Sequence, residues 1–376
     1  MNAYDVAVIG AGGVGSAALS ALARRGARVL GIDRFSPPHD RGSTHGDTRV
    51  IRLAYFEHPD YVPLLRAAYQ GWARLEASRG QKFYEERGVV QAGPEDGVVV
   101  PGVLASARAH DLEVEKLSPS AANRRFPSLR VPANMSAVFE KRAGFLWVER
   151  CVEALLSEAK EHGAHLWTEA PVRAIRAEQG GFLVETAGDT AAAKRLVIAP
   201  GAWAPELLRD LGPLPLSFEV RRKCLFWLEK AADPEAPVFL FETEGGVFYG
   251  FPPMAGDSLK LAEHSGGRVV SDPLGVDRQI DLEEQQRVLA FARTHLGGSP
   301  DRPIRHATCL YTMTPDERFI VDRHPLHANA VVIAGLSGHG FKFASVLGEI
   351  AADLALDGGT RHPIDFLGLS RFSERR

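Results

Sequence analysis

A glycine-rich turn near the start of the chain constrains the fold more than any other feature. Residues 6–9 form an apolar run of strand length, and the pattern G-x-G-x-x-G follows at Gly10, Gly12 and Gly15. An alanine- and leucine-rich stretch of helical composition comes next, and a second apolar run, residues 28–32, ends at Asp33. This order of strand, glycine turn, helix, strand and acid is typical of a dinucleotide-binding βαβ unit.

Each glycine of the motif has a physical task. Gly10 permits a tight turn, Gly12 lets the backbone approach a pyrophosphate, and Gly15 lets the helix pack close to the strand. The helix N-terminus then faces the phosphates, and Asp33 accepts hydrogen bonds from a ribose, which disfavours a 2′-phosphate. The motif predicts a bound dinucleotide, but it leaves NAD and FAD both open.

Later segments extend this domain and interrupt it. Residues 195–208 and 330–342 each read as a buried strand that runs into a glycine turn, whereas residues 220–230 and 246–253 are β-branched and aromatic, which indicates a mixed sheet. We therefore predict an α/β chain (α+β overall), with a discontinuous Rossmann-like FAD/NAD domain interleaved with a substrate domain built on a mixed β-sheet. The predicted boundaries are 1–86, 143–213 and 317–376 for the first domain, and 87–142 and 214–316 for the second.

A polar segment, residues 36–46, follows Asp33 and is rich in turn residues, so we expect irregular backbone there. Arg49, Arg52 and Tyr55 come next at spacings of three, which predicts one side of a helical turn. A solvated surface is the simple interpretation of these arginines. Their position favours a ligand site, because loops that leave the carboxyl ends of α/β strands meet at the ligand.

A lysine near the end of the chain lies where a cation is locally unfavourable. Lys342 falls in the first turn of an expected helix, whose apolar face carries Phe343, Val346, Leu347, Ile350 and Leu354. That turn already has unpaired N–H groups and a partial positive charge. Lys342 therefore either faces an anion or points into water.

Composition and charge do not point to a nucleic-acid or membrane partner. The chain has 376 residues, of which 45% are hydrophobic, and its 44 basic against 47 acidic residues give a net charge of −3. This balance gives no reason to expect nucleic acid or an anionic membrane, and no apolar run has membrane-spanning length. The three cysteines are far apart, so we expect no disulfide framework, no metal site and a cytoplasmic location.

Six stretches together resemble one known family: VIGAGGVGSAA, PPHDRGSTHGDTRVIRLAY, YGFP, LKLAEH, CLYTMTPDERFIVD and GLSGHGFKFASVLGEIAAD. They are similar to the sarcosine oxidase and N-methyl-L-tryptophan oxidase family, a branch of the D-amino-acid-oxidase-like, FAD-dependent amine oxidases. The stretches run from the first strand almost to the C-terminus, so the resemblance covers essentially the whole chain.

The resemblance implies roles for particular residues. It implies FAD rather than NAD, bound covalently through Cys309, and a substrate carboxylate held by Arg52 and Lys342. It places Lys260 beside the flavin for oxygen reduction, and it gives Arg49 and His264 further catalytic roles. The implied substrate cavity also carries Tyr249, Tyr311 and His339. The implied cofactor-binding residues are Gly10, Ala11, Gly12, Val14, Gly15, Asp33, Arg34, Ser43, Thr44, His45, Arg49, Val172, Ala199, Gly201, Trp203, Cys309, Gly338, Gly340, Phe341 and Lys342.

Some of these residues have simpler alternatives. A lone cysteine such as Cys309 is usually an inert buried thiol, and flavin attachment needs an electropositive site, for which we consider His45 and Arg49. His264 and His339 are equally compatible with hydrogen-bonded core histidines. The chain departs from close relatives at Thr44, Leu53 and Phe56, which puts the size and polarity of the substrate pocket in doubt.

The function that follows from these features is oxidation of a secondary, N-methylated α-amino acid. The products would be the demethylated amino acid, formaldehyde and hydrogen peroxide, and the protein would be a monomer. The alternatives are a related oxidase of pipecolate or fructosyl amino acids, and a FAD dehydrogenase or redox-silent FAD protein that serves a partner. Lys260 argues against the last class, since a cation beside the flavin has no obvious role unless oxygen is reduced there.

Overall fold

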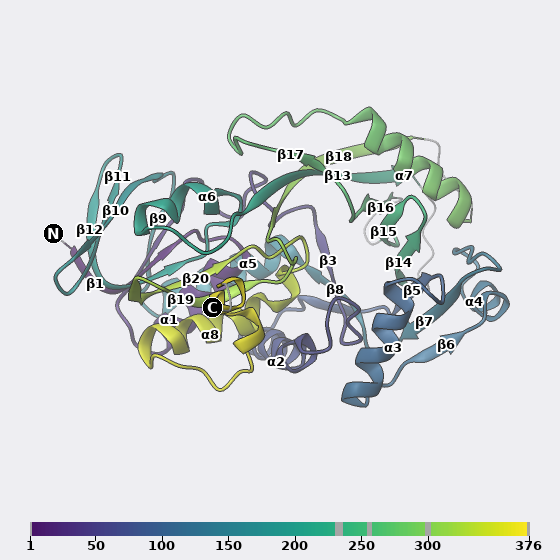
Figure 1. Ribbon diagram of the computed structural model, residues 1–376, viewed down its shortest axis with the longest axis horizontal. Helices are drawn as coiled ribbons and strands as arrows, with labels where there is room; N and C mark the ends of the chain where they lie inside the picture. The colour runs from purple at the N-terminus through teal and green to yellow at the C-terminus, as the bar shows by residue number, and fades with distance from the viewer. Residues whose placement is uncertain (1, 230–235, 254–257, 298–301, 374–376) are drawn as a thin grey trace.

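The computed structural model describes residues 2–229, 236–253, 258–297 and 302–373, and its strands form two large sheets and one small sheet. The first sheet lies to the left in Figure 1. Its strands β9, β2, β1, β12 and β20 are parallel neighbours in that order. The strands of this sheet are β1 (Asn2–Ile9), β2 (Val29–Ile32), β9 (His165–Trp167), β10 (Val172–Glu178), β11 (Gly181–Thr186), β12 (Thr190–Ile198), β19 (Ile320–His324) and β20 (His327–Ala334).

Helices cover the parallel core of the first sheet. One face packs against α1 (Gly13–Arg24), α2 (Tyr61–Arg79), α5 (Val148–Glu161) and α8 (Ala344–Leu356), and the other packs near α6 (Ala204–Leu207). The two later strands expected from the sequence are β12 and β20, and both run parallel to β1. The prediction that they deliver their following turns to the same crevice as the glycine motif is therefore confirmed.

The second sheet is mixed, as the aromatic and β-branched segments predicted. Strand β14 pairs with β5 in parallel, and the other paired strands of this sheet are antiparallel. Its strands are β5 (Val89–Gly93), β6 (Glu115–Leu117), β7 (Ser136–Glu140), β13 (Glu219–Glu229), β14 (Val238–Thr243), β15 (Gly246–Phe251), β16 (Ser258–Glu263), β17 (Arg268–Val269) and β18 (Pro303–Met313). Helices α4 (Pro119–Arg125) and α7 (Leu282–His295) pack on one face, and α3 (Val99–His110) packs on the other.

A small third sheet corrects one prediction. It consists of β3 (Thr48–Ile51), β8 (Gly144–Trp147) and β4 (Tyr84–Glu86). The helical turn expected for Arg49, Arg52 and Tyr55 is wrong, because Arg49 lies on β3 and the other two follow it in irregular backbone. Pairing of β3 with β8, nearly a hundred residues away, overrides the local spacing. Residues 36–46 contain no helix or strand, as expected.

Short 3₁₀ turns complete the description: η1 (Gly201–Trp203), η2 (Arg209–Leu211), η3 (Phe341–Phe343), η4 (Asp365–Leu367) and η5 (Leu369–Phe372). Lys342 lies in η3, directly before α8, rather than inside the first turn of the α-helix. The domain boundaries given above remain a prediction. No helix in the described part of the chain is long and apolar enough to cross a membrane.

Candidate active site

A cavity opens at the carboxyl ends of the parallel strands. Sixteen of the predicted cofactor-binding residues line it: Gly10, Gly12, Val14, Asp33, Arg34, Ser43, Thr44, Arg49, Val172, Ala199, Gly201, Trp203, Cys309, Gly338, Gly340 and Phe341. The other four, Ala11, Gly15, His45 and Lys342, are not among its lining residues. The sequence analysis missed further lining residues, including Pro37, His39 and Thr312.

The glycine turn has the close contacts that its sequence predicted. Gly10 has a φ of 88°, and a Cβ there would lie 2.4 Å from the carbonyl oxygen of Ala199. A Cβ on Gly15 would lie 1.7 Å from the carbonyl oxygen of Gly10, so only glycine allows α1 to start against the strand. The backbone N–H of Ala11 donates to Asp33 Oδ2 at 2.7 Å, which fixes the acid at the cavity wall.

Two orphaned polar groups show that this cavity suits a polar ligand. Trp203 Nε1 and Thr312 Oγ1 are buried without a hydrogen-bond partner among the described residues, and both residues line the cavity. Buried donors of this kind require an acceptor. The N-cap of α1 is Gly12, which has no side chain to cap the helix, so the first-turn N–H groups are suited to phosphate oxygens. The residues present therefore fit a dinucleotide.

A second, smaller cavity of about 60 Å³ adjoins the first, because Arg49, Tyr311, Gly338 and Phe341 line both. The predicted substrate residues all line it, together with His264: Arg52, Tyr249, Tyr311, His339 and Lys342. Phe56, which the sequence analysis connected with the size of the pocket, lines it as well, whereas the sequence analysis missed Val50, Glu57 and Leu240.

Arg52 and Glu57 form a buried ion pair in the wall of the second cavity. Arg52 Nη2 donates to both carboxylate oxygens of Glu57, each at 3.0 Å. Although burial opposes ionisation, Arg52 lowers the pKa of Glu57 to about 2, so the pair is charged at neutral pH. Arg52 Nη1 is buried and has no partner among the described residues. The only sequence signal for Glu57 was an acid within the apolar stretch that follows Arg52.

Lys342 belongs to a chain of hydrogen bonds that fixes the protonation of its neighbours. Its Nζ donates to the backbone oxygen of His339 at 2.6 Å and to the Tyr55 hydroxyl at 3.3 Å. The Tyr55 hydroxyl in turn donates to His339 Nδ1 at 2.6 Å, and His339 Nε2 donates to the Glu317 carbonyl at 3.2 Å. Burial lowers the pKa of His339 to about 3, consistent with this neutral tautomer. Burial and the charge of Arg52 lower the pKa of Lys342 to about 7.

His264, Tyr249 and Tyr311 add no charge to the second cavity. Burial lowers the pKa of His264 to about 4, and its Nδ1 forms a hydrogen bond of 3.4 Å with the Tyr311 hydroxyl. Burial also raises the pKa of both Tyr249 and Tyr311. At neutral pH the charge of this cavity therefore comes from arginine, lysine and Glu57.

Cys309 lies on β18, and its buried side chain lines the first cavity beside Arg49, which lines both cavities. Its Sγ is 3.8 Å from Arg49 Nη2 and 3.9 Å from the Ser43 carbonyl oxygen. Burial disfavours a charged Arg49, yet Cys309 and Tyr249 raise the pKa of its guanidinium, which stays cationic. The expectation that His45 adds positive charge here is wrong, because burial and the charge of Arg49 lower the pKa of His45 to about 3.

Lys260 is buried on β16 and lines neither cavity. Its Nζ lies within hydrogen-bonding distance of three oxygens: Gly46 O at 2.5 Å, Thr48 O at 2.8 Å and Thr48 Oγ1 at 3.4 Å. Burial and Arg49 lower the pKa of Lys260, but three acceptors match the three N–H groups of an ammonium and exceed the two of a neutral amine. We therefore treat Lys260 as a cation that acts on the site through its field.

Comparison with known proteins agrees with this geometry. The family model described as FAD dependent oxidoreductase matches residues 5–354. The chain belongs to this family. It is 43% identical over 371 residues to monomeric sarcosine oxidase from Streptomyces avermitilis, with 96% of each chain covered. It is 38% identical over 379 residues to N-methyl-L-tryptophan oxidase from Escherichia coli O127:H6, with 98% of this chain and 99% of the relative covered.

Solved structures share the fold. The open form of NikD, described as an unusual amino acid oxidase essential for nikkomycin biosynthesis, superposes with a TM-score of 0.89 at 26% identity, covering 98% of both chains. Glycine oxidase from Geobacillus kaustophilus has a TM-score of 0.82 at 22% identity and covers 99% of both chains. The protein is thus a FAD-dependent oxidoreductase, and the first cavity is the site whose residues fit FAD. No cluster of three or more potential metal ligands occurs within the described ranges.

Proposed function

We propose that this FAD-dependent oxidoreductase is an oxidase of small secondary α-amino acids, with N-methyl amino acids as the substrate class. The buried pair of cations, Arg52 and Lys342, carries the proposal. Both line the small cavity that adjoins the FAD cavity, and Arg52 Nη1 has no partner within the part of the chain that the structure describes. A substrate carboxylate would supply that partner, since an arginine fork suits a carboxylate.

The chain's own residues then orient the substrate and set its protonation. Arg52 and Lys342 would hold the carboxylate, while Glu57 keeps the Arg52 guanidinium in place through its second nitrogen. The same two cations disfavour a protonated amine nearby, and the amine must be neutral before its carbon can lose a hydride. FAD held by the residues of the first cavity would supply the redox chemistry, as the acceptor of that hydride and the donor of electrons to oxygen. The oxidised amine is an imine, and water hydrolyses it to the demethylated amino acid and formaldehyde, while oxygen becomes hydrogen peroxide.

The size of the second cavity narrows the substrate class. A water molecule needs at least about 10–15 Å³ of such space, so the cavity of about 60 Å³ holds roughly four to six waters. Sarcosine, with six non-hydrogen atoms, matches this space, whereas an indole side chain requires Phe56 or Leu240 to move. We therefore expect sarcosine and similarly small N-methyl amino acids to be better substrates than N-methyltryptophan.

Further parts of the proposal concern the state of the protein. We propose that Cys309 binds FAD covalently, supported by the cationic Arg49 guanidinium next to its sulfur, because a nearby cation stabilises a thiolate. We also propose a monomer in the cytoplasm, supported by a monomeric relative and by three free cysteines.

A peroxide-coupled screen of the purified yellow protein under air tests the proposal. It should include sarcosine, N-methylalanine, N-methyltryptophan, pipecolate and fructosyl amino acids. Peroxide release that is fastest with a small N-methyl amino acid supports the proposed substrate class. Flavin bleaching by the substrate without peroxide would instead identify a dehydrogenase that passes its electrons to another acceptor.

A further inference from the structure

An irregular segment of the substrate domain reaches across to the loop that borders the FAD cavity. We call residues 270–281, between β17 and α7, the strap, and residues 36–46, after β2, the cofactor loop; neither contains a helix or strand. The strap begins at β13, where Val270 N donates to Val220 O at 2.8 Å. Its side chains Val270 and Val276 pack against a cluster that includes Trp203, a residue of the FAD cavity.

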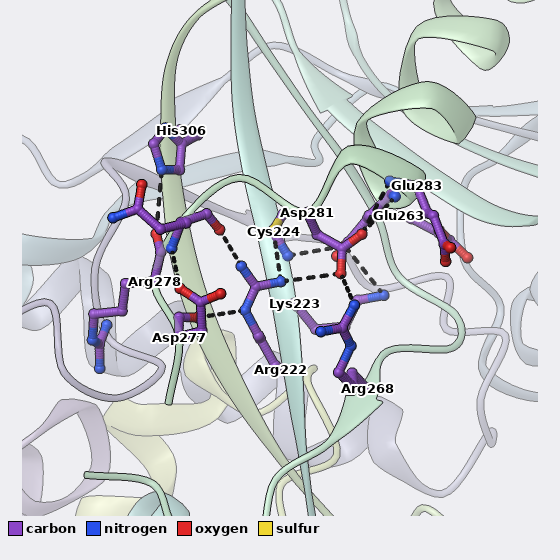
Figure 2. A network of polar contacts seen from close by, with 12 residues as sticks. Arg222, Lys223, Cys224, Glu263, Arg268, Asp277, Arg278, Asp281, Glu283 and His306 are labelled. Atoms are coloured by element: carbon purple, nitrogen blue, oxygen red, sulfur yellow. Dashed lines mark hydrogen bonds and ion pairs between the residues drawn. The ribbon is translucent and has the colours of Figure 1, made fainter. Parts of the chain in front are cut away.

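Arg222 on β13 anchors the strap through contacts with Asp277 and Asp281, which lie on either side of its guanidinium in Figure 2. Its side chain is only 4% exposed. Nε donates to the backbone oxygen of Asp277 at 2.6 Å, and Nη2 donates to the backbone oxygen of Gln279. Nη1 lies 3.5 Å from the Asp281 carboxylate, which also accepts the N–H groups of Glu283 and Glu284 at the start of α7. The middle and the end of the strap are therefore held by one buried guanidinium.

Arg278 connects this anchored strap to the cofactor loop. Its Nη1 donates to the backbone oxygen of Asp40 and its Nη2 to that of Arg41, each at 2.8 Å. Nη1 also approaches the Thr308 carbonyl oxygen at 3.5 Å, and His306 Nε2 donates to the carbonyl oxygen of Arg278 at 3.3 Å. Thr308 and His306 lie on β18 close to Cys309, so Arg278 joins the cofactor loop to the strand that carries this cysteine.

Other groups already hold the later part of the cofactor loop: Leu310 N donates to Gly42 O at 3.3 Å, and Arg49 Nη2 donates to Ser43 O at 2.7 Å. Arg278 provides the corresponding contact for the two residues before Gly42. The side chains of Asp40 and Arg41 are 71% and 53% exposed, so more than half of each lies in solvent. The next three residues, Gly42, Ser43 and Thr44, line the FAD cavity. A guanidinium presents its N–H groups in a fixed fork, so two adjacent carbonyls held by Arg278 define the position of the chain directly before these residues.

We propose that Arg278 is a positioning residue for FAD, which holds the cofactor loop in its binding geometry by fixing the Asp40 and Arg41 carbonyls. Arg278 is not among the residues that line either cavity, so it acts on FAD through the loop. The proposal depends on FAD binding, which the family shows, and is independent of the amino-acid substrate.

FAD affinity tests the proposal directly. All variants carry Cys309→Ala, so that any FAD is exchangeable, and the dissociation constant is measured by titrating the apoprotein with FAD and following flavin fluorescence. We expect Arg278→Ala to raise the dissociation constant about tenfold, which corresponds to about 1.4 kcal/mol. The matched control is Arg293→Ala, which removes an exposed arginine of α7 and should leave the constant within about twofold, as surface changes do.

Two further measurements separate positioning from general stability. Trypsin should cut the Arg41–Gly42 bond faster in Arg278→Ala than in the control, with the product identified by its mass, while the thermal midpoint of the apoprotein stays near that of the control. Arg278→Lys, which keeps the charge but not the fork, should give an intermediate FAD affinity. An FAD dissociation constant in Arg278→Ala within twofold of the control overturns the proposal, whatever trypsin shows. If the alanine variant lacks a cooperative unfolding transition, the FAD dissociation constant of Arg278→Lys is used instead, and a value within twofold of the control overturns the proposal.

Discussion

The pKa of Lys342 gives the sharpest test of the carboxylate site. The lysine is charged below its pKa of about 7 and neutral above it. A carboxylate held by Arg52 and Lys342 should therefore bind well at mildly acidic pH and lose affinity as the pH rises. A simple carboxylate without an amine, such as propionate, isolates this effect, because only the protein then titrates.

The size of the effect follows from linkage. Lys342 has a lower pKa in the free protein than in the complex with a bound carboxylate. Between these two pKa values, the affinity for the carboxylate falls tenfold per pH unit. From about pH 7 to about pH 9 the dissociation constant should rise up to about a hundredfold, or about 2.7 kcal/mol. The other titratable groups of the cavity do not change charge in this range: the pKa values of Glu57, His339 and His264 are lowered to about 2, 3 and 4, and those of Tyr249 and Tyr311 are raised.

The assay is a titration of the oxidised holoprotein with propionate, followed by the change in flavin absorbance, at several pH values from about pH 6 to about pH 9. The matched variant is Lys342→Met, which keeps the length of the side chain without the charge. It should bind weakly and with little dependence on pH. A pH-independent affinity in the unmodified protein, or the same pH dependence in Lys342→Met, would refute the assignment of Lys342 to the carboxylate.

Three further predictions concern single side chains. Arg52→Ala should lower kcat/KM by an amount equivalent to about 2–5 kcal/mol of lost transition-state stabilisation, the range for removing one partner of a buried charge pair. The variant should keep its flavin. An unchanged kcat/KM in flavin-loaded protein would contradict this prediction. Lys260→Met should leave anaerobic reduction of the flavin by substrate nearly intact. It should slow re-oxidation of the flavin by air roughly a hundredfold in a stopped-flow experiment, because a fixed cation stabilises developing superoxide. Equal re-oxidation rates in the variant and the unmodified protein would show that Lys260 is a structural lysine of the loop around Gly46. Acid-precipitated protein should stay yellow and yield a flavin-bearing Cys309 peptide, whereas colour released entirely into the supernatant would rule out covalent attachment.

The sequence by itself determined the features that depend on local backbone geometry. The turn Gly10–Gly15 requires glycines because a Cβ would collide with backbone oxygens. The sequence shows this requirement because all the glycines concerned lie within six consecutive residues. Likewise, the segments that form β12 and β20 are rich in apolar residues, and this composition predicted that they are buried. The sequence predicted a ligand-binding role for Arg52 and Lys342 because each lies in a segment next to a predicted ligand loop.

Only the tertiary structure decided which side chains meet and which of them carry charge. The local spacing of Arg49, Arg52 and Tyr55 favoured a helix, but pairing of β3 with β8 placed Arg49 on a strand and left the other two in irregular backbone. Glu57 became the partner of Arg52, while Arg49 and burial removed the charge expected on His45.

The contact of Arg278 with the cofactor loop joins residues more than two hundred positions apart, and nothing in the neighbourhood of Arg278 in the sequence indicates it. The charge of a side chain and its contacts depend on its burial and on its distance from groups remote in the sequence. Burial and these distances are defined only once the chain has folded.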